Sequence, residues 1–101
     1  MRLLWEAAQA LPAYRGRTAL VLATDHGRGA TTKDWSDHGK DVPAAENTWM
    51  AAIGPSVPAL GVRRGLTVTA SQFAATIAVV VGEDFHAAMP KSAPALPLTV
   101  R

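Results

Sequence analysis

The chain has 101 residues and a mass of 10.6 kDa, enough for one small domain. Ten Lys and Arg against eight Asp and Glu give a net charge of +2 without any basic cluster, which argues against nucleic-acid binding. Hydrophobic residues make up 49%, but 20 residues are Ala, and Leu, Ile, Val and Phe together number 22. This is a thin supply for a self-sufficient core, so we expect an incomplete domain of a larger fold.

Several classes of site and location are excluded or left open by simple features of the chain. The absence of Cys excludes disulfides, Cys-ligated zinc and a thiol nucleophile. No run approaches the roughly 18 apolar residues of a membrane span, so we expect no membrane partner. Glu6 interrupts the N-terminus too early for a signal peptide. Localisation stays open, because an export signal would lie upstream if Met1 is not the true start.

The first half of the chain predicts a helix, a strand and a long polar loop. Apolar residues at helical spacing predict a helix over 3–11, which Pro12 stops. The continuous apolar run within 17–24 predicts a strand buried on both faces, as in a parallel sheet under helices. Asp, Gly, Lys and Thr dominate 25–46, and so long a loop is usually functional or disordered.

The second half predicts a short strand, a helix and a tail. The strand covers 48–53, and the Pro and Gly residues after it indicate an irregular surface connection. A helix is expected over 70–81, because Thr69 and Gln72 have the spacing of a capping box and Gly82 supplies a stop. Three prolines predict an extended tail over 86–101.

The polar residues that follow the first predicted strand are the best candidates for a site. Ligands of open α/β sheets bind at the carboxyl ends of the strands, where Asp25 and His26 lie. Asp oxygen and His nitrogen suit zinc or manganese. His38, in a second Asp-His-Gly tripeptide, can fold back beside His26. The alternative is that Asp25 and His26 cap a turn and that His38 is an exposed loop residue.

Other polar residues carry weaker expectations. Arg28 and Lys33 could contact an anionic substrate, although solvated loop charges are the simpler interpretation of both. His86 has no partner at ligand spacing, and Ser71 has no acid–base pair beside it, so neither indicates a catalytic triad.

An ordered series of segments resembles the alkaline phosphatase superfamily, which includes sulfatases, nucleotide phosphodiesterases and cofactor-independent phosphoglycerate mutases. The hydrophobic strand ending in Asp-His-Gly lies at Thr18–Gly29, and the downstream His before a Gly lies in Trp35–Gly39. The segments Trp49–Pro55 and 70–85 resemble the strand and the helix that follow in such proteins. Ser71 and Gln72 depart from the pattern, since many relatives have Asp there.

The resemblance, which covers roughly residues 3–85, implies a fold and a metal centre. The implied fold class is α/β, the C-terminal part of a mostly parallel sheet flanked by helices. Asp25 and His26 would bind one ion of a two-metal centre, most simply zinc with manganese as the other choice, and His38 would bind the second ion. The nucleophile and the remaining ligands of relatives have no counterpart in this chain, so the isolated chain should bind metal weakly and be inactive.

Two functions follow as alternatives. The first is the C-terminal part of a metal-dependent hydrolase or phosphotransferase acting on small anionic esters of phosphate, sulfate or phosphonate. The second is a non-catalytic α/β interaction module in which the three residues are ordinary loop residues and a partner chain covers the thin core. Metal-independent folding with a stable homo-oligomer would favour the second function, while weak zinc or manganese binding lost on replacing Asp25 or His38 by Ala would favour the first.

Overall fold

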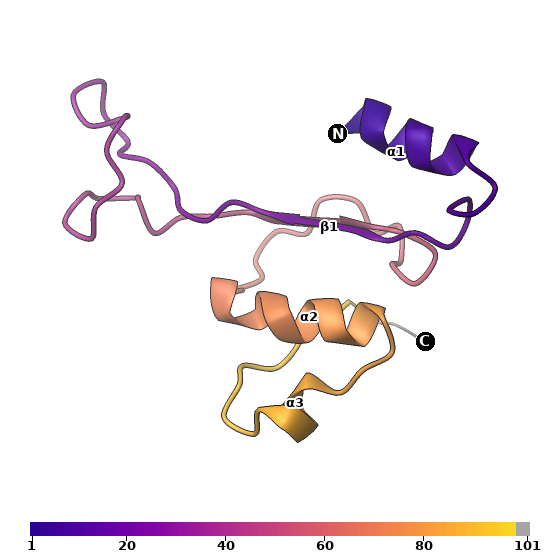
Figure 1. The fold of residues 1–101 in the computed structure, drawn as a ribbon. Helices are drawn as coiled ribbons and strands as arrows, with labels where there is room; N and C mark the ends of the chain where they lie inside the picture. The colour runs from indigo at the N-terminus through magenta and orange to yellow at the C-terminus, as the bar shows by residue number, and fades with distance from the viewer. Residues whose placement is uncertain (99–101) are drawn as a thin grey trace. The chain divides into compact units, whose positions relative to one another are not determined.

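The computed structural model of the chain describes residues 1–98. Its helices and strands, in chain order, are α1 (Arg2–Ala10), β1 (Leu20–Ala23), β2 (Met50–Ile53), the 3-10 helix η1 (Ala70–Gln72), α2 (Phe73–Val80) and α3 (Phe85–Ala88) (Figure 1). Each of the two predicted strands and each of the two predicted helices has a counterpart at its place in the chain. No helix within residues 1–98 is long and apolar enough to cross a membrane.

The sheet is a two-stranded antiparallel ribbon of β1 and β2, so the expectation of a mostly parallel sheet flanked by helices is wrong. The Thr24 N–H donates to the Trp49 carbonyl at 3.3 Å, while Gly54 lies against Ala19, so residue numbers run in opposite directions along the pair. Parallel strands need a crossover connection, usually a helix. The segment between β1 and β2 forms turns without a helix, so the chain doubles back.

The burial of β1 also differs from the expectation of a strand covered on both faces. Three of its residues are half-buried and Ala23 is exposed. A ribbon of two strands leaves the outer edge of each strand without a hydrogen-bonding neighbour. The apolar sequence of β1 is therefore typical of a strand that is buried more deeply than β1 is within residues 1–98.

The chain divides into two compact units, and their boundaries fall within β1 and β2. One unit, here unit 1, contains Met1–Val21 and the chain from Ala52 onward, and unit 2 is Leu22–Ala51. Among residues 1–98, the buried hydrophobic residues are one Ala in each unit, Ala75 and Ala45.

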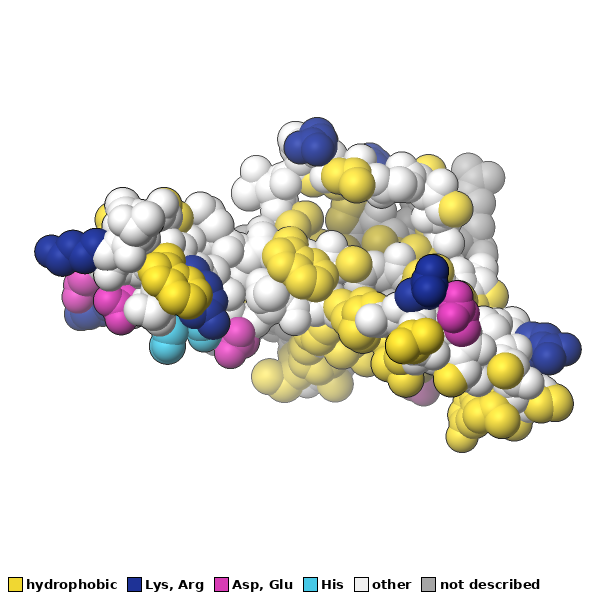
Figure 2. Space-filling model, turned by 90° about the horizontal axis from the view of Figure 1, so that it is seen from above, with side chains coloured by type: hydrophobic (Ala, Val, Ile, Leu, Met, Phe, Trp, Pro, Cys, Tyr) yellow, Lys and Arg dark blue, Asp and Glu magenta, His cyan; other side chains and the backbone are white. Residues whose placement is uncertain are grey.

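Large apolar side chains remain at the surface in consequence. Leu3 is 75% exposed, Val62 81% and Trp35 60%. Figure 2 shows hydrophobic side chains distributed over the visible face. These exposed side chains agree with the thin core predicted from composition.

Helix α2 shows clear start and stop signals. The Gln72 side-chain oxygen accepts a hydrogen bond from the Thr69 N–H at 2.9 Å, which is one half of the predicted capping box. At the other end Gly82 adopts φ +87°, the left-handed conformation that glycine allows. The Glu83 N–H donates to the Ala78 carbonyl at 2.8 Å, so the helix ends in a Schellman motif.

The tail after α2 is not simply extended, because α3 forms one helical turn within it. The Asp84 side chain accepts hydrogen bonds from the backbone N–H groups of His86 at 2.9 Å and Ala87 at 3.2 Å, and thereby caps α3. Residues 89–98 contain neither helix nor strand. The part of the predicted tail at 99–101 lies outside the described residues.

Candidate functional site

The loop of unit 2 is folded back on itself by two backbone hydrogen bonds next to β1. The Gly27 N–H donates to the Ala45 carbonyl at 2.7 Å, and the Gly29 N–H donates to the Asp37 carbonyl at 3.1 Å. Gly29 is buried, and Ala45 is 5% exposed. The predicted site thus begins directly after β1. The bond from Gly29 to Asp37 brings the second Asp-His-Gly tripeptide against the first.

Glycine is required at both points because other backbone atoms approach closely. A Cβ on Gly27 would lie 2.2 Å from the Asn47 carbonyl oxygen and 2.7 Å from that of Ala44. A Cβ on Gly29 would lie 2.2 Å from the Asp34 carbonyl oxygen. The Asp-His-Gly-Arg-Gly pattern therefore has a packing reason as well as a chemical one.

The folding of this loop stacks the two histidines that the sequence singled out. The ring centroids of His26 and His38 lie 3.9 Å apart, and the ring planes differ by 16°. His26 is half-buried and His38 is exposed. The structure thus brings together side chains that are twelve positions apart, as the sequence predicted.

The hydrogen bonds of His26 determine which ring nitrogen is free. Its Nδ1 lies 2.7 Å from the Gly27 carbonyl oxygen, and because a carbonyl only accepts, Nδ1 carries the proton in this bond. In the neutral ring Nε2 then presents a lone pair. A backbone carbonyl on the opposite nitrogen is the usual arrangement of a metal-binding histidine, since it orients the ring and raises its basicity.

Asp25 lies on the same side as the free nitrogen of His26. Its Oδ2 is 3.6 Å from His26 Nε2, while its Oδ1 accepts a hydrogen bond from the His26 N–H at 2.9 Å. Two ligands at roughly 2.0–2.1 Å from a tetrahedral zinc ion are separated by about 3.4 Å. The donor types and the separation of Asp25 and His26 therefore fit one divalent ion.

His38 does not join Asp25 and His26 around the same point. Imidazole lone pairs lie in the ring plane, and the two planes are nearly parallel, so the lone pairs do not converge at bonding distance. Within residues 1–98, no three His, Asp or Glu side chains converge on a position that could hold a metal ion. The described residues therefore offer two donor atoms near one point, from Asp25 and His26, and a separate one from His38.

The two positive residues expected near an anionic substrate lie in the same loop. The Arg28 guanidinium carbon is 5.7 Å from the centre of the Trp35 ring, so the cation rests over an aromatic face. Lys33 is exposed, a few residues along the loop.

A separate turn shapes the loop between the two tripeptides. The Thr31 hydroxyl and the Thr31 N–H, the latter at 2.9 Å, both donate to Oδ1 of Asp34. These bonds hold the pKa of Asp34 below its ordinary value of 3.8, because both favour the carboxylate. The hydroxyl bond has the larger effect and the backbone bond the smaller one.

Replacing Thr31 by Val should raise the pKa of Asp34 toward its ordinary value. A lowered pKa in the folded state stabilises the turn above the ordinary pKa, and this stabilisation is lost as the pH falls through the folded-state pKa. The change would be followed by an NMR titration of the Asp34 carboxyl carbon. Thr32→Val is the matched control, and an equal shift in both variants would show that the Thr31 hydroxyl is not the cause.

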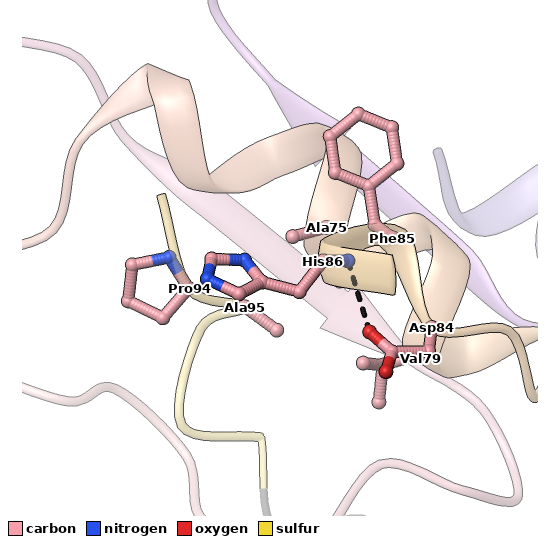
Figure 3. Close-up of a pocket in the computed structure, with 7 residues that line it drawn as sticks. All are labelled: Ala75, Val79, Asp84, Phe85, His86, Pro94 and Ala95. Atoms are coloured by element: carbon pink, nitrogen blue, oxygen red, sulfur yellow. Dashed lines mark hydrogen bonds between the residues drawn. The ribbon is translucent and has the colours of Figure 1, made fainter. Parts of the chain in front are cut away.

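Unit 1 has a pocket that sequence reasoning missed. It has a volume of about 220 Å³ and is lined by Ala75, Val79, Asp84, Phe85, His86, Pro94 and Ala95 (Figure 3). Nδ1 of His86 lies 2.8 Å from Oγ of Ser92. The Asp84 carboxylate bonds to the His86 backbone, so these residues do not form a Ser-His-Asp triad. The spacing of these residues in the sequence did not indicate a pocket, because the tail lines it only in the folded chain.

No known family model, curated protein or solved structure matches the chain.

Proposed function

We propose that Asp25, His26 and His38 supply ligands to a two-metal centre that hydrolyses phosphate, sulfate or phosphonate esters. The observation that carries this proposal is the stack of His26 on His38 beside the Asp25 carboxylate. Two parallel imidazoles 3.9 Å apart, each holding its own ion, would separate the ions by about the 3.5–4 Å of two-metal hydrolases.

Each residue has a distinct part in this function. Asp25 and His26 would hold one divalent ion, with the Gly27 carbonyl orienting the imidazole, and His38 would hold the other. The ions would supply positive charge to the attacking and leaving oxygens of the ester. Arg28, whose guanidinium lies over the Trp35 ring, would bind an anionic group of the substrate. We assign no nucleophile among the residues of this loop.

The second candidate function is the non-catalytic interaction module. It is favoured by the exposed Leu, Val and Trp side chains, because such side chains are typical of protein–protein contacts. The two candidates differ in whether the histidine stack binds metal.

The proposal predicts zinc binding that depends on both Asp25 and His38. Asp25→Ala and His38→Ala should each weaken zinc affinity by at least roughly tenfold, because each removes a direct ligand. Isothermal titration of the full chain with zinc, and then with manganese, would measure this loss. The control is Asp37→Ala, which removes a nearby carboxylate and keeps the carbonyl that accepts from Gly29. Zinc affinity equal in all four proteins would favour the interaction module.

A further inference from the structure

The pocket of unit 1 has walls from three segments that hydrogen bonds hold together. Helix α2, the start of α3 and residues 94–95 of the tail supply its lining (Figure 3). The Leu96 N–H donates to the Thr76 hydroxyl at 2.8 Å, and the Gln72 side-chain nitrogen donates to the Pro94 carbonyl at 3.2 Å. Both bonds tie the tail to α2. The pocket is therefore formed by one stretch of chain within unit 1.

Most of the lining is apolar, and small side chains leave room for a ligand. Ala75 and Ala95 carry only a methyl group, and the other apolar lining residues are Val79, Phe85 and Pro94. The pocket has a volume of about 220 Å³, and an apolar cavity of about 150 Å³ is enough to hold benzene. Pockets for drug-sized ligands measure roughly 300–1,000 Å³. The volume therefore fits one aromatic ring with a short substituent.

The polar part of the lining is formed by Asp84 and His86, both of which are exposed. Asp84 uses Oδ1 to accept the N–H groups that it caps in α3, and its Oδ2 accepts no hydrogen bond from residues 1–98. Within the described part of unit 1, no Lys or Arg forms an ion pair with this carboxylate. An ammonium group brings three N–H donors and a positive charge, so it is the group that Oδ2 would bind most strongly.

We propose that this pocket binds a primary ammonium compound with a single aromatic ring, of about the size of benzylammonium. The ring lies among the apolar side chains of α2 and the tail, and the ammonium donates to Oδ2 of Asp84. Because Asp84 is exposed, the ion pair raises the affinity by a factor of only roughly two to five, and burial of the ring supplies the rest. The proposed metal site in unit 2 takes no part in this binding.

The first experiment compares three probes that share an aromatic ring and differ in charge. Benzylammonium, benzyl alcohol and benzoate are each titrated into the full chain, and the backbone amide shifts are followed by NMR. We expect saturable shifts at Ala75, Phe85 and Ala95, with benzylammonium bound roughly two- to fivefold more tightly than benzyl alcohol, and benzoate bound most weakly. Equal affinity for benzylammonium and benzyl alcohol would overturn the role of the charge. Shifts that do not saturate would overturn the binding site.

The second experiment tests the Asp84 carboxylate. Asp84→Asn removes the charge but keeps a residue suited to cap α3, so this variant should bind benzylammonium only as tightly as the wild type binds benzyl alcohol. Glu83→Gln is the matched control, because it removes the neighbouring charge, which does not line the pocket, and should leave the affinity unchanged. An equal loss of benzylammonium affinity in both variants would show that the general acidity of this segment, and not Asp84 itself, attracts the ammonium.

The third experiment tests whether the ring enters the cavity. In Ala95→Leu the larger side chain takes up the space, so binding of both benzylammonium and benzyl alcohol should be lost. Slow exchange of the Leu96 amide checks that the tail still lies on α2 in this variant. Nuclear Overhauser contacts from the benzylammonium ring protons to the Ala75 and Ala95 methyl groups test the same point in the wild type. Their absence at saturation would overturn the pocket as the binding site.

Discussion

Replacing Gly27 by Ala should destabilise unit 2 by about 1–3 kcal/mol, the usual cost of overpacking. The new methyl group would lie 2.2 Å from the Asn47 carbonyl oxygen and 2.7 Å from that of Ala44. Both neighbours are backbone atoms, so the clash cannot be relieved by turning a side chain. The loop must open instead, and the bond from the Gly27 N–H to the Ala45 carbonyl is lost with it.

Amide hydrogen exchange would show this opening at Gly27 itself. Under the proposed function, zinc affinity should fall in parallel by roughly 10- to 100-fold, because the Gly27 carbonyl orients the His26 ring. The matched control is Gly39→Ala, where the nearest atom to a new Cβ is 4.0 Å away on the Val42 side chain. Equal exchange rates in the two variants would contradict the close approach described for Gly27.

Replacing Thr76 by Val should cost unit 1 about 1–3 kcal/mol, although the two side chains have nearly the same shape. Thr76 is 1% exposed, and its hydroxyl donates to the Gln72 carbonyl at 2.7 Å. The same oxygen accepts a hydrogen bond from the Leu96 N–H at 2.8 Å, which ties the tail to α2. Valine would leave the Leu96 N–H without its partner in a part-buried place.

The direct readout is the exchange rate of the Leu96 amide, together with the midpoint of urea denaturation. We expect fast exchange at Leu96 and a lower midpoint in Thr76→Val. Thr67→Val is the control, because Thr67 is exposed and lies in the irregular connection before η1. Unchanged protection of Leu96 in Thr76→Val would show that the tail is held by other contacts, such as the bond from Gln72 to the Pro94 carbonyl at 3.2 Å.

The site and the fold depend on different kinds of information. The contact between His26 and His38 could be predicted, because the loop begins at a strand end and glycines in both tripeptides permit a sharp return. That these rings would stack with nearly parallel planes was not predictable, since it depends on the paired backbone bonds at Gly27 and Gly29. Proximity of the two rings alone would also fit a single ion with three ligands. The nearly parallel planes are what favour two separate ions in the proposed site.

Local signals determined the elements whose partners are close in sequence. The helix over 70–81 could be read from Thr69, Gln72 and Gly82, because capping is decided within one or two helical turns. The expectation of an extended tail rested on its prolines and took no account of Asp84, a favourable N-cap, and it therefore missed the helical turn of α3.

By itself the sequence determined the helix near the start of the chain, the helix that follows Thr69, and the two segments that are apolar enough for strands. Each of these follows from residues a few positions apart. The direction of the β1–β2 pairing and the incomplete burial of β1 were decided only by the tertiary structure. The physical reason is that strand pairing and burial depend on what packs beside a segment, and an apolar run such as that of β1 reads the same in a parallel sheet and in an open antiparallel ribbon.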